Sequence, residues 1–116
     1  MFKHMTATFS GICIFAAVAF SLSSMAQSGT PDDAMKAYME AQQKMMTSMQ
    51  NMKMTGNPDN DFVMMMMPHH QGAIDMAEIE VKYGKDAKLQ DMAKAIIKAQ
   101  TQEIAEMKKW QQEHGL

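Results

Sequence analysis

The sequence contains one cysteine and no arginine, and these two absences exclude several classes of protein. With a single Cys among 116 residues, the chain can form neither a disulfide framework nor a zinc site made of thiolates. All eleven basic residues are Lys, which argues against nucleic-acid binding, where bidentate Arg contacts dominate. The sequence also lacks an HExxH motif, a phosphate-binding loop and a recognisable nucleophile with its base. We therefore do not predict an enzyme.

Methionine is the residue that the sequence has in excess, with 17 copies. The length fits one domain, since single cores usually organise about 100–150 residues. Apolar residues make up 47% of the chain and charged residues 21%, a composition typical of a folded protein. We therefore expect one folded domain in which Met takes many of the positions that Leu usually occupies.

Residues 1–26 have the features of a secretory signal peptide. A basic start at Lys3 is followed by an apolar run over residues 11–22, and small residues lead up to Ala26. The apolar run is shorter than the roughly 20 residues that a membrane span needs. We expect cleavage near Ala26, a periplasmic or secreted location, and no stable membrane insertion of the mature chain, 27–116. An uncleaved N-terminal anchor is the alternative.

The mature chain shows helical periodicity and no segment with the alternation typical of a strand. The predicted helices cover about residues 31–54, 62–83 and 86–114. Thr30 before Pro31 is a strong helix start, Asp61 is the expected N-cap of the second helix, and Gly84 should end it. The predicted fold class is all-α, an antiparallel three-helix unit.

An antiparallel hairpin brings together residues that lie equally far from its turn. Around the first turn, the expected facing pairs are Met46 with His70, Met49 with Met67, and Met52 with Met64 or Met65. Around the second turn, they are Met66 with Glu103 and His69 with Gln100. The two hairpins would thus bring thioethers, two imidazoles, an amide and a carboxylate to one level of the bundle.

Thioether sulfur with imidazole nitrogen is a donor set that favours soft metal ions. Thioethers select Cu(I), imidazole also suits copper, and we expect Ag(I) to follow the same preference. A thioether needs no deprotonation, whereas an imidazole binds metal less well once it is protonated. Oxidising surroundings disfavour free thiols, so thioether is the form of sulfur ligand expected to persist in an exported protein.

Methionine also fills irregular spaces in cores. We assign Met35, Met39, Met76 and Met92 to the core, because the mature chain has only two Leu residues. The run 64–67 points all round its helix, so a core role does not explain all four of its Met residues. Gln100 and Glu103 would either support the imidazoles of a metal site or form ordinary hydrogen bonds between helices.

Two motifs resemble the signature of a known family. They are DFxxxMxPHHQGAIxMA over residues 61–77 and IIxxQxxEIxxMxxW over residues 96–110. Together they are similar to the domain of unknown function 305 family, over about residues 59–111. The resemblance implies a ferritin-like helical bundle that binds copper outside the cytoplasm and contributes to copper tolerance.

The candidate metal-site residues come from two sources. The resemblance implies Met66, His69, His70, Met76 and Met107 as ligands, with Gln100 and Glu103 in support. The facing pairs add Met46, Met49, Met65 and Met67. Larger family members carry more helices, so we expect this chain to complete its bundle by self-association, as a homodimer.

The first functional hypothesis is an exported copper-binding protein that sequesters or shuttles Cu(I) without catalysis. A copper exporter or a copper oxidase would be its expected partner. A periplasmic chaperone is one alternative, because flexible Met surfaces bind many apolar partners. A Met-based oxidant sink that cycles through sulfoxide is another.

Overall fold

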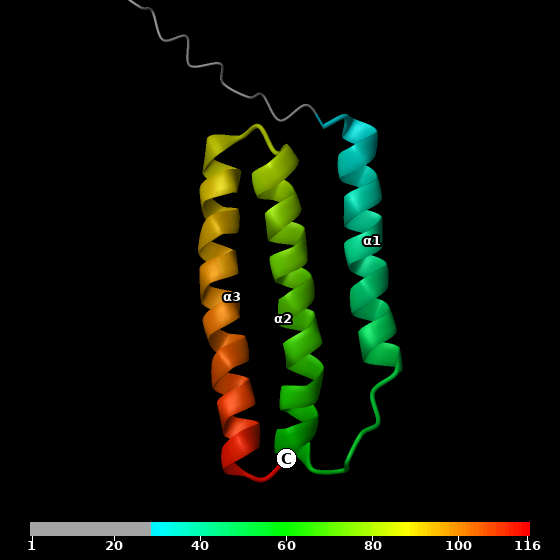
Figure 1. The fold of residues 1–116 in the computed structure, drawn as a ribbon, viewed down its shortest axis with the longest axis vertical. Helices are drawn as coiled ribbons and strands as arrows, with labels where there is room; N and C mark the ends of the chain where they lie inside the picture. Colours follow the sequence, from blue (N-terminus) through cyan, green and yellow to red (C-terminus); the bar gives the residue numbers. More distant parts are fainter. Residues whose placement is uncertain (1–28) are drawn as a thin grey trace, which may run out of the picture.

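The computed structural model describes residues 29–116, which form three helices and no strand (Figure 1). The helices are α1 (Pro31–Gln50), α2 (Pro58–Tyr83) and α3 (Ala87–Glu113). The predicted all-α, three-helix unit is therefore confirmed, while the predicted signal peptide lies outside the described residues. In the part of the chain that the structure describes, no helix combines the length and the apolar character that a membrane span requires.

Helix α1 starts where the sequence predicts but ends four residues early. Thr30 forms a capping box, in which its Oγ1 accepts from the Asp33 N–H at 3.2 Å and its own N–H donates to Asp33 Oδ2 at 2.9 Å. The helix ends at Gln50 instead of residue 54. Because of this early end, Met52 and Met54 belong to the loop that follows α1. The loop turns through Gly56, at φ +83°, to reach α2.

Helix α2 begins at Pro58, four residues before the predicted start. Asn57 is the N-cap, and its Oδ1 accepts from the N–H groups of Asp59 at 3.0 Å and Asn60 at 3.3 Å. The prediction that Asp61 is the N-cap was wrong, because Asn57 followed by Pro58 provides a complete start signal further upstream. Asp61 instead lies in the first turn of α2, where its carboxylate reaches back to the loop.

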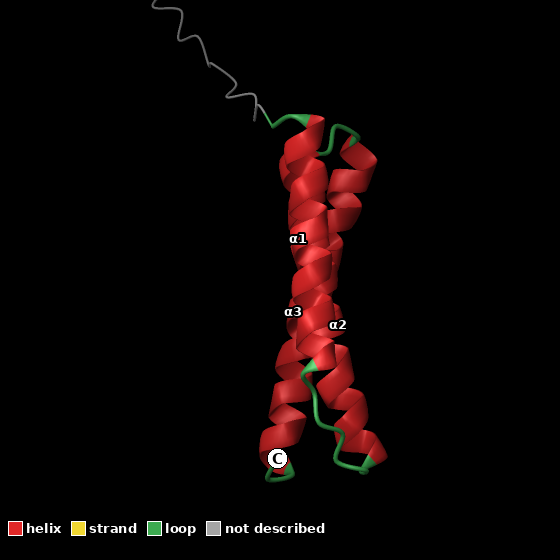
Figure 2. Ribbon diagram, turned by 90° about the vertical axis from the view of Figure 1, so that its right-hand side faces the viewer, coloured by secondary structure: helices red, strands yellow, loops and turns green. Residues whose placement is uncertain are grey.

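The helices form an open layer with α2 in the middle and α1 and α3 on either side of it (Figure 1). Figure 2 views this layer from the α1 side, with α1 in front and the lower ends of α2 and α3 diverging. Within residues 29–116, α1 and α3 do not pack against each other. The helices therefore bury only the sides that meet a neighbour, and both faces of the layer stay open.

Three contacts set the position of α1 against α2. Lys44 Nζ lies 2.8 Å from Asp75 Oδ2, and the Tyr38 hydroxyl donates to Glu80 Oε2 at 3.3 Å. Between these pairs and the loop, a Cβ atom on Gly72 would lie 2.5 Å from Met45 Sδ. Glycine at position 72 thus allows the thioether of Met45 to lie directly against the α2 backbone.

The register between α2 and α3 differs from the predicted one by one to four residues, which is at most about one helical turn. Gln111 Nε2 donates to Asn60 Oδ1 at 3.3 Å, and His70 Nε2 lies 2.5 Å from Glu103 Oε2. The numbers of these facing residues add up to 171 and 173, whereas the turn position predicts 169–170. As a result His70 faces Glu103, the residue that the sequence pattern pairs with Met66.

The core is small and contains no methionine. Its buried apolar residues are Ala41, Val63, Ile74, Ala77, Ile79 and Ala93. None of the 14 Met residues in the described part of the chain is buried. The assignment of Met35, Met39, Met76 and Met92 to the core was wrong, since these side chains are 39–65% exposed. In an open layer, small side chains such as Ala fill the narrow contacts between helices, and the longer Met side chains remain outside them.

The Asp61 carboxylate holds the loop between α1 and α2, and we expect its loss to free that loop. Asp61 accepts from the Thr55 N–H and Thr55 hydroxyl, both at 2.7 Å, and from the Gly56 N–H at 3.0 Å. These hydrogen bonds, the Thr55 N–H first, lower the pKa of Asp61 below its ordinary value of 3.8. The carboxylate therefore stabilises the fold above pH 3.8, and this contribution is lost as the pH falls through the lowered pKa.

Asp61→Asn should accelerate amide hydrogen exchange at Thr55 and Gly56 at neutral pH, and wild type should show the same change only in acid. Asp59→Asn is the matched control, because Asp59 lies in the same helical turn but accepts no hydrogen bond from the loop. Equal exchange at Thr55 and Gly56 in both variants would contradict the role assigned to Asp61.

Candidate metal centre

His70 lies in the contact between α2 and α3, with one ring nitrogen bound and the other free. The residue is 7% exposed, and its Nε2 contacts Glu103 Oε2. An ionised carboxylate can only accept a hydrogen bond, so Nε2 carries the proton and donates it. In the neutral ring the lone pair is then on Nδ1, which is buried and has no hydrogen-bond partner. The structure thus presents a buried, unpaired nitrogen donor.

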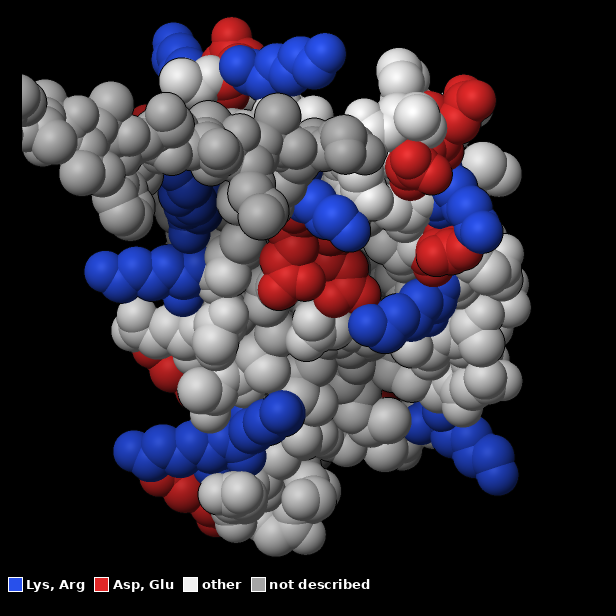
Figure 3. Space-filling view, turned by 45° about the horizontal axis from the view of Figure 1, so that its top comes forward, with Lys and Arg blue, Asp and Glu red and all other residues white. Residues whose placement is uncertain are grey.

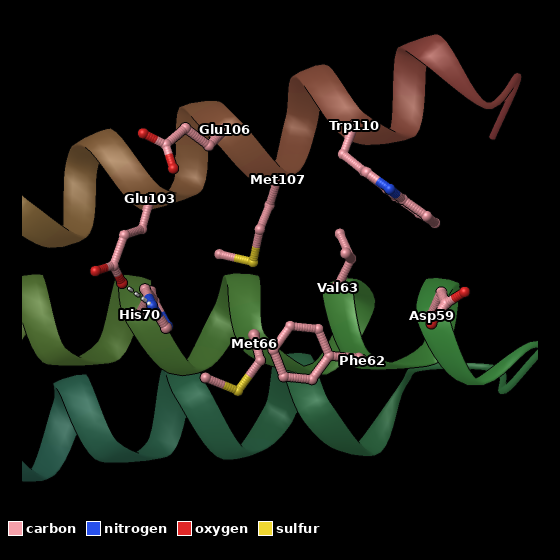
Figure 4. Close-up of a pocket in the computed structure, with 9 residues that line it drawn as sticks. All are labelled: Asp59, Phe62, Val63, Met66, His70, Glu103, Glu106, Met107 and Trp110. Atoms are coloured by element: carbon pink, nitrogen blue, oxygen red, sulfur yellow. Dashed lines mark hydrogen bonds and ion pairs between the residues drawn. The ribbon is translucent and has the colours of Figure 1, made fainter.

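A pocket of about 550 Å³ opens beside His70, between α2 and α3. Its lining comprises Asp59, Phe62, Val63, Met66, His70, Glu103, Glu106, Met107 and Trp110. Figure 4 shows Met107 projecting from α3 and Met66 from α2, with the Glu103 carboxylate directed at the His70 ring. Two thioethers and one imidazole therefore line the same pocket.

The charges around this pocket favour a cation. Asp59, Glu103 and Glu106 line it, whereas no Lys does. Elsewhere the charges are mixed, and Figure 3 shows Lys side chains beside Asp and Glu side chains on the end of the layer near the α2–α3 turn. The ring of Trp110 could add a cation–π attraction at the far side of the pocket. The pocket thus combines soft donors with a negative surrounding.

The structure brings together only part of the predicted set. Met66, His70, Glu103 and Met107 line the pocket, while the other candidates lie outside it. Those others are His69, Met46, Met65 and Met76, which are exposed, and Met49, Met67 and Gln100, which are half-buried. The ring of His69 lies 6.3 Å from that of His70 but on the exposed side of α2. Gln100 stands about one turn along α3 from Glu103, and its Oε1 is buried without a partner.

Several residues of the lining were not predicted from the sequence. Phe62 and Trp110 belong to the two motifs but were not predicted to be site residues, and Asp59 and Glu106 were not predicted either. Glu103, Met107 and Trp110 follow one another at spacings of four and three along α3, so the helical stripe contained the signal for Trp110. Asp59 gave no such signal, because it lies before residue 62, where the second helix was predicted to begin.

Within residues 29–116, no three side chains of His, Cys, Asp or Glu come together as a metal-binding group. The group around His70 instead consists of one imidazole with its carboxylate partner and two thioethers. It differs in kind from sites built on several imidazoles, thiolates or carboxylates.

Comparison with known proteins identifies a family. No curated protein matches the chain. A family model described as "Domain of unknown function (DUF305)" matches residues 16–111. The match includes all of α1, which the two motifs do not cover, and starts within the predicted signal peptide. Since it spans most of the sequence and contains both motifs, the chain belongs to the domain of unknown function 305 family.

Proposed function

We propose that the protein binds Cu(I) as cargo, and sequesters or shuttles it, through His70, Met66 and Met107. The observation that carries the proposal is the buried Nδ1 atom of His70, which has no hydrogen-bond partner and belongs to a residue that lines a pocket together with two thioethers. Leaving a buried polar atom unpaired costs about 1–3 kcal/mol. A bound metal ion would offset this cost.

The contact with Glu103 supports the same function. Metal-bound His residues commonly donate their other ring N–H to a carboxylate, which fixes the tautomer and makes the ligating nitrogen more basic. The Glu103 carboxylate meets Nε2, so the nitrogen left for metal is Nδ1. Together with two thioethers, this donor set suits Cu(I) or Ag(I) better than a hard cation.

The proposed location is the periplasm or the outside of the cell, based on the signal-peptide features of residues 1–26. A protein that holds Cu(I) there would contribute to copper tolerance. It could pass the ion to a copper exporter or a copper oxidase.

We further propose that a second copy of the chain covers the open face of the layer. A groove over Ala73 and Ala77 is lined from α1 by Tyr38 and from α3 by Leu89, Met92 and Ile96. The apolar side chains Tyr38, Met76, Leu89, Met92 and Ile96 are 36–53% exposed there. Within residues 29–116, no large side chain is fully buried. A small chain with so little core commonly gains stability by association, and α3 offers its continuous apolar stripe for that purpose.

An oxidant sink remains the second candidate function, because seven Met side chains in the described chain are at least 39% exposed. Exposed thioethers are accessible to oxidants and can be reduced again from the sulfoxide. This function would not depend on His70, so the His70 variant described next separates it from copper binding.

We expect His70→Ala to weaken Cu(I) binding strongly, because it removes the only nitrogen ligand of the pocket. Glu103→Gln should have a smaller effect, within the roughly 10–100-fold range typical of residues that orient a metal ligand. Affinity is measured by titration of the purified protein against a competing Cu(I) chelator, and far-UV circular dichroism checks that each variant is folded.

His69→Ala is the matched control, since it removes the neighbouring imidazole, which is exposed and outside the pocket. It should bind Cu(I) as wild type does. If His69→Ala and His70→Ala weaken binding equally, or if wild type binds no Cu(I), the proposed centre is wrong.

We expect Ile96→Lys to abolish self-association, because it places a charge in the apolar groove that the second copy would cover. Analytical ultracentrifugation over a range of concentrations should show a dimer for wild type and a monomer for this variant. Gln102→Lys adds the same charge at an exposed position of α3 and should leave the dimer intact. A wild-type protein that sediments as a monomer throughout would refute the proposed dimer.

A further inference from the structure

A second pocket, of about 530 Å³, lies at the end of the layer where α2 begins and α3 ends. It is lined by Met52, Asn60, Met64, Met67, Pro68, Gln111 and Leu116, and it shares no lining residue with the pocket at His70. Three of its seven lining residues are therefore methionines. They come from the loop after α1 and from two successive turns of α2.

Like the other methionines of the described chain, these three are not part of the core. Met52, Met64 and Met67 are all half-buried and line an open space, whereas a core methionine would be enclosed by packed neighbours. Met64 and Met67 lie three residues apart on α2, so they share one side of the helix. All three side chains are thus reachable from solvent, and two of them lie on the same side of α2.

A hydrogen-bond chain orients one of the three thioethers. Asn60 is 4% exposed, and its Nδ2 lies 3.5 Å from Met64 Sδ. The Oδ1 atom of the same amide accepts from Gln111 Nε2 at 3.3 Å, which fixes which end of the amide meets the sulfur. A thioether sulfur has two lone pairs, so the contact with Asn60 leaves one lone pair of Met64 available.

The loop that carries Met52 is also held in place. Asp61, in the first turn of α2, binds the backbone at Thr55 and Gly56. This contact restricts the short segment between Met52 and α2. Met52 lies three residues before Thr55 in this loop, and its side chain lines the same pocket as those of Met64 and Met67.

We propose that Met52, Met64 and Met67 form a second binding site, made of thioethers alone, for a soft monovalent cation, Cu(I) or Ag(I). None of the lining side chains carries a carboxylate, an imidazole or an ammonium group. Neutral, soft donors favour soft monovalent ions over Mg²⁺, Ca²⁺ or Zn²⁺, which need charged or harder ligands. The inference rests on the proposed function, which it extends from one copper ion per chain to two at chemically different sites.

The test uses Ag(I), which binds as Cu(I) does but does not change oxidation state under these conditions. Native mass spectrometry of the purified protein counts the bound ions, and NMR of protein labelled with ¹³C at the Met methyl groups identifies the sulfurs that bind. Wild type should bind two Ag(I) ions per chain, and His70→Ala should bind one. The ¹³C methyl signals of Met52, Met64 and Met67 should shift in both proteins.

The double variant Met64→Leu with Met67→Leu should bind one Ag(I) ion, one fewer than wild type. Combined with His70→Ala, it should bind none, one fewer than His70→Ala alone. These changes nearly conserve side-chain volume and should preserve the fold. Met52→Leu, which changes only a loop residue, provides a second variant with the same expected loss. The matched control is Met35→Leu with Met39→Leu, two exposed methionines of α1 in another surface region, which should lose no ion.

The possible outcomes separate the two proposals. If wild type binds one ion, and His70→Ala abolishes it while Met64→Leu with Met67→Leu does not, the second site is refuted and the centre at His70 stands. If Met64→Leu with Met67→Leu and its control in α1, Met35→Leu with Met39→Leu, lose the same number of Ag(I) ions, the second site is also refuted. If wild type binds no Ag(I), the proposed function itself fails.

Discussion

Helix α2 packs against both other helices, and the arrangement of the whole described chain depends on it. Each hydrogen bond or ion pair between helices has one partner on α2: Glu80 and Asp75 toward α1, and His70 and Asn60 toward α3. Because α1 and α3 do not contact each other, each of them is positioned only through α2. The two candidate sites lie where α2 meets α3, so the same contacts that hold the layer together also position their donors.

The number and type of the helices could be predicted because their signals are local. Thr30 with Pro31, and Gly84 after Tyr83, mark helix ends in a few neighbouring residues, and the structure places both ends there. The loop between α1 and α2 could not be predicted in the same way. Its position depends on the Asp61 carboxylate reaching back to Thr55, a contact that competes with the role of N-cap suggested by the sequence.

The candidate centre at His70 was predicted in part. The resemblance of the two motifs implied Met66, His70, Glu103 and Met107, but it also implied His69 and Met76, which the structure places outside the pocket. Which residues of the two helices face each other depends on the register of α2 along α3. Because the predicted register was wrong by up to one turn, His70 rather than Met66 faces Glu103. The assignment of Met76 and Met92 to the core assumed that Met takes the place of Leu in a closed core. That assumption fails, because the open layer leaves these side chains without a covering helix.

The thin core and the accessible methionines have one structural cause. A layer of three helices buries only narrow strips between neighbours, and small residues such as Ala41, Ala77 and Ala93 fill them. The thioethers are therefore left half-buried or exposed, where they can reach a metal ion. The groove over Ala73 and Ala77 shares no lining residue with either candidate site. A second copy seated on that groove would therefore add the missing core while leaving His70 and the pocket of Met52, Met64 and Met67 open to their proposed cargo.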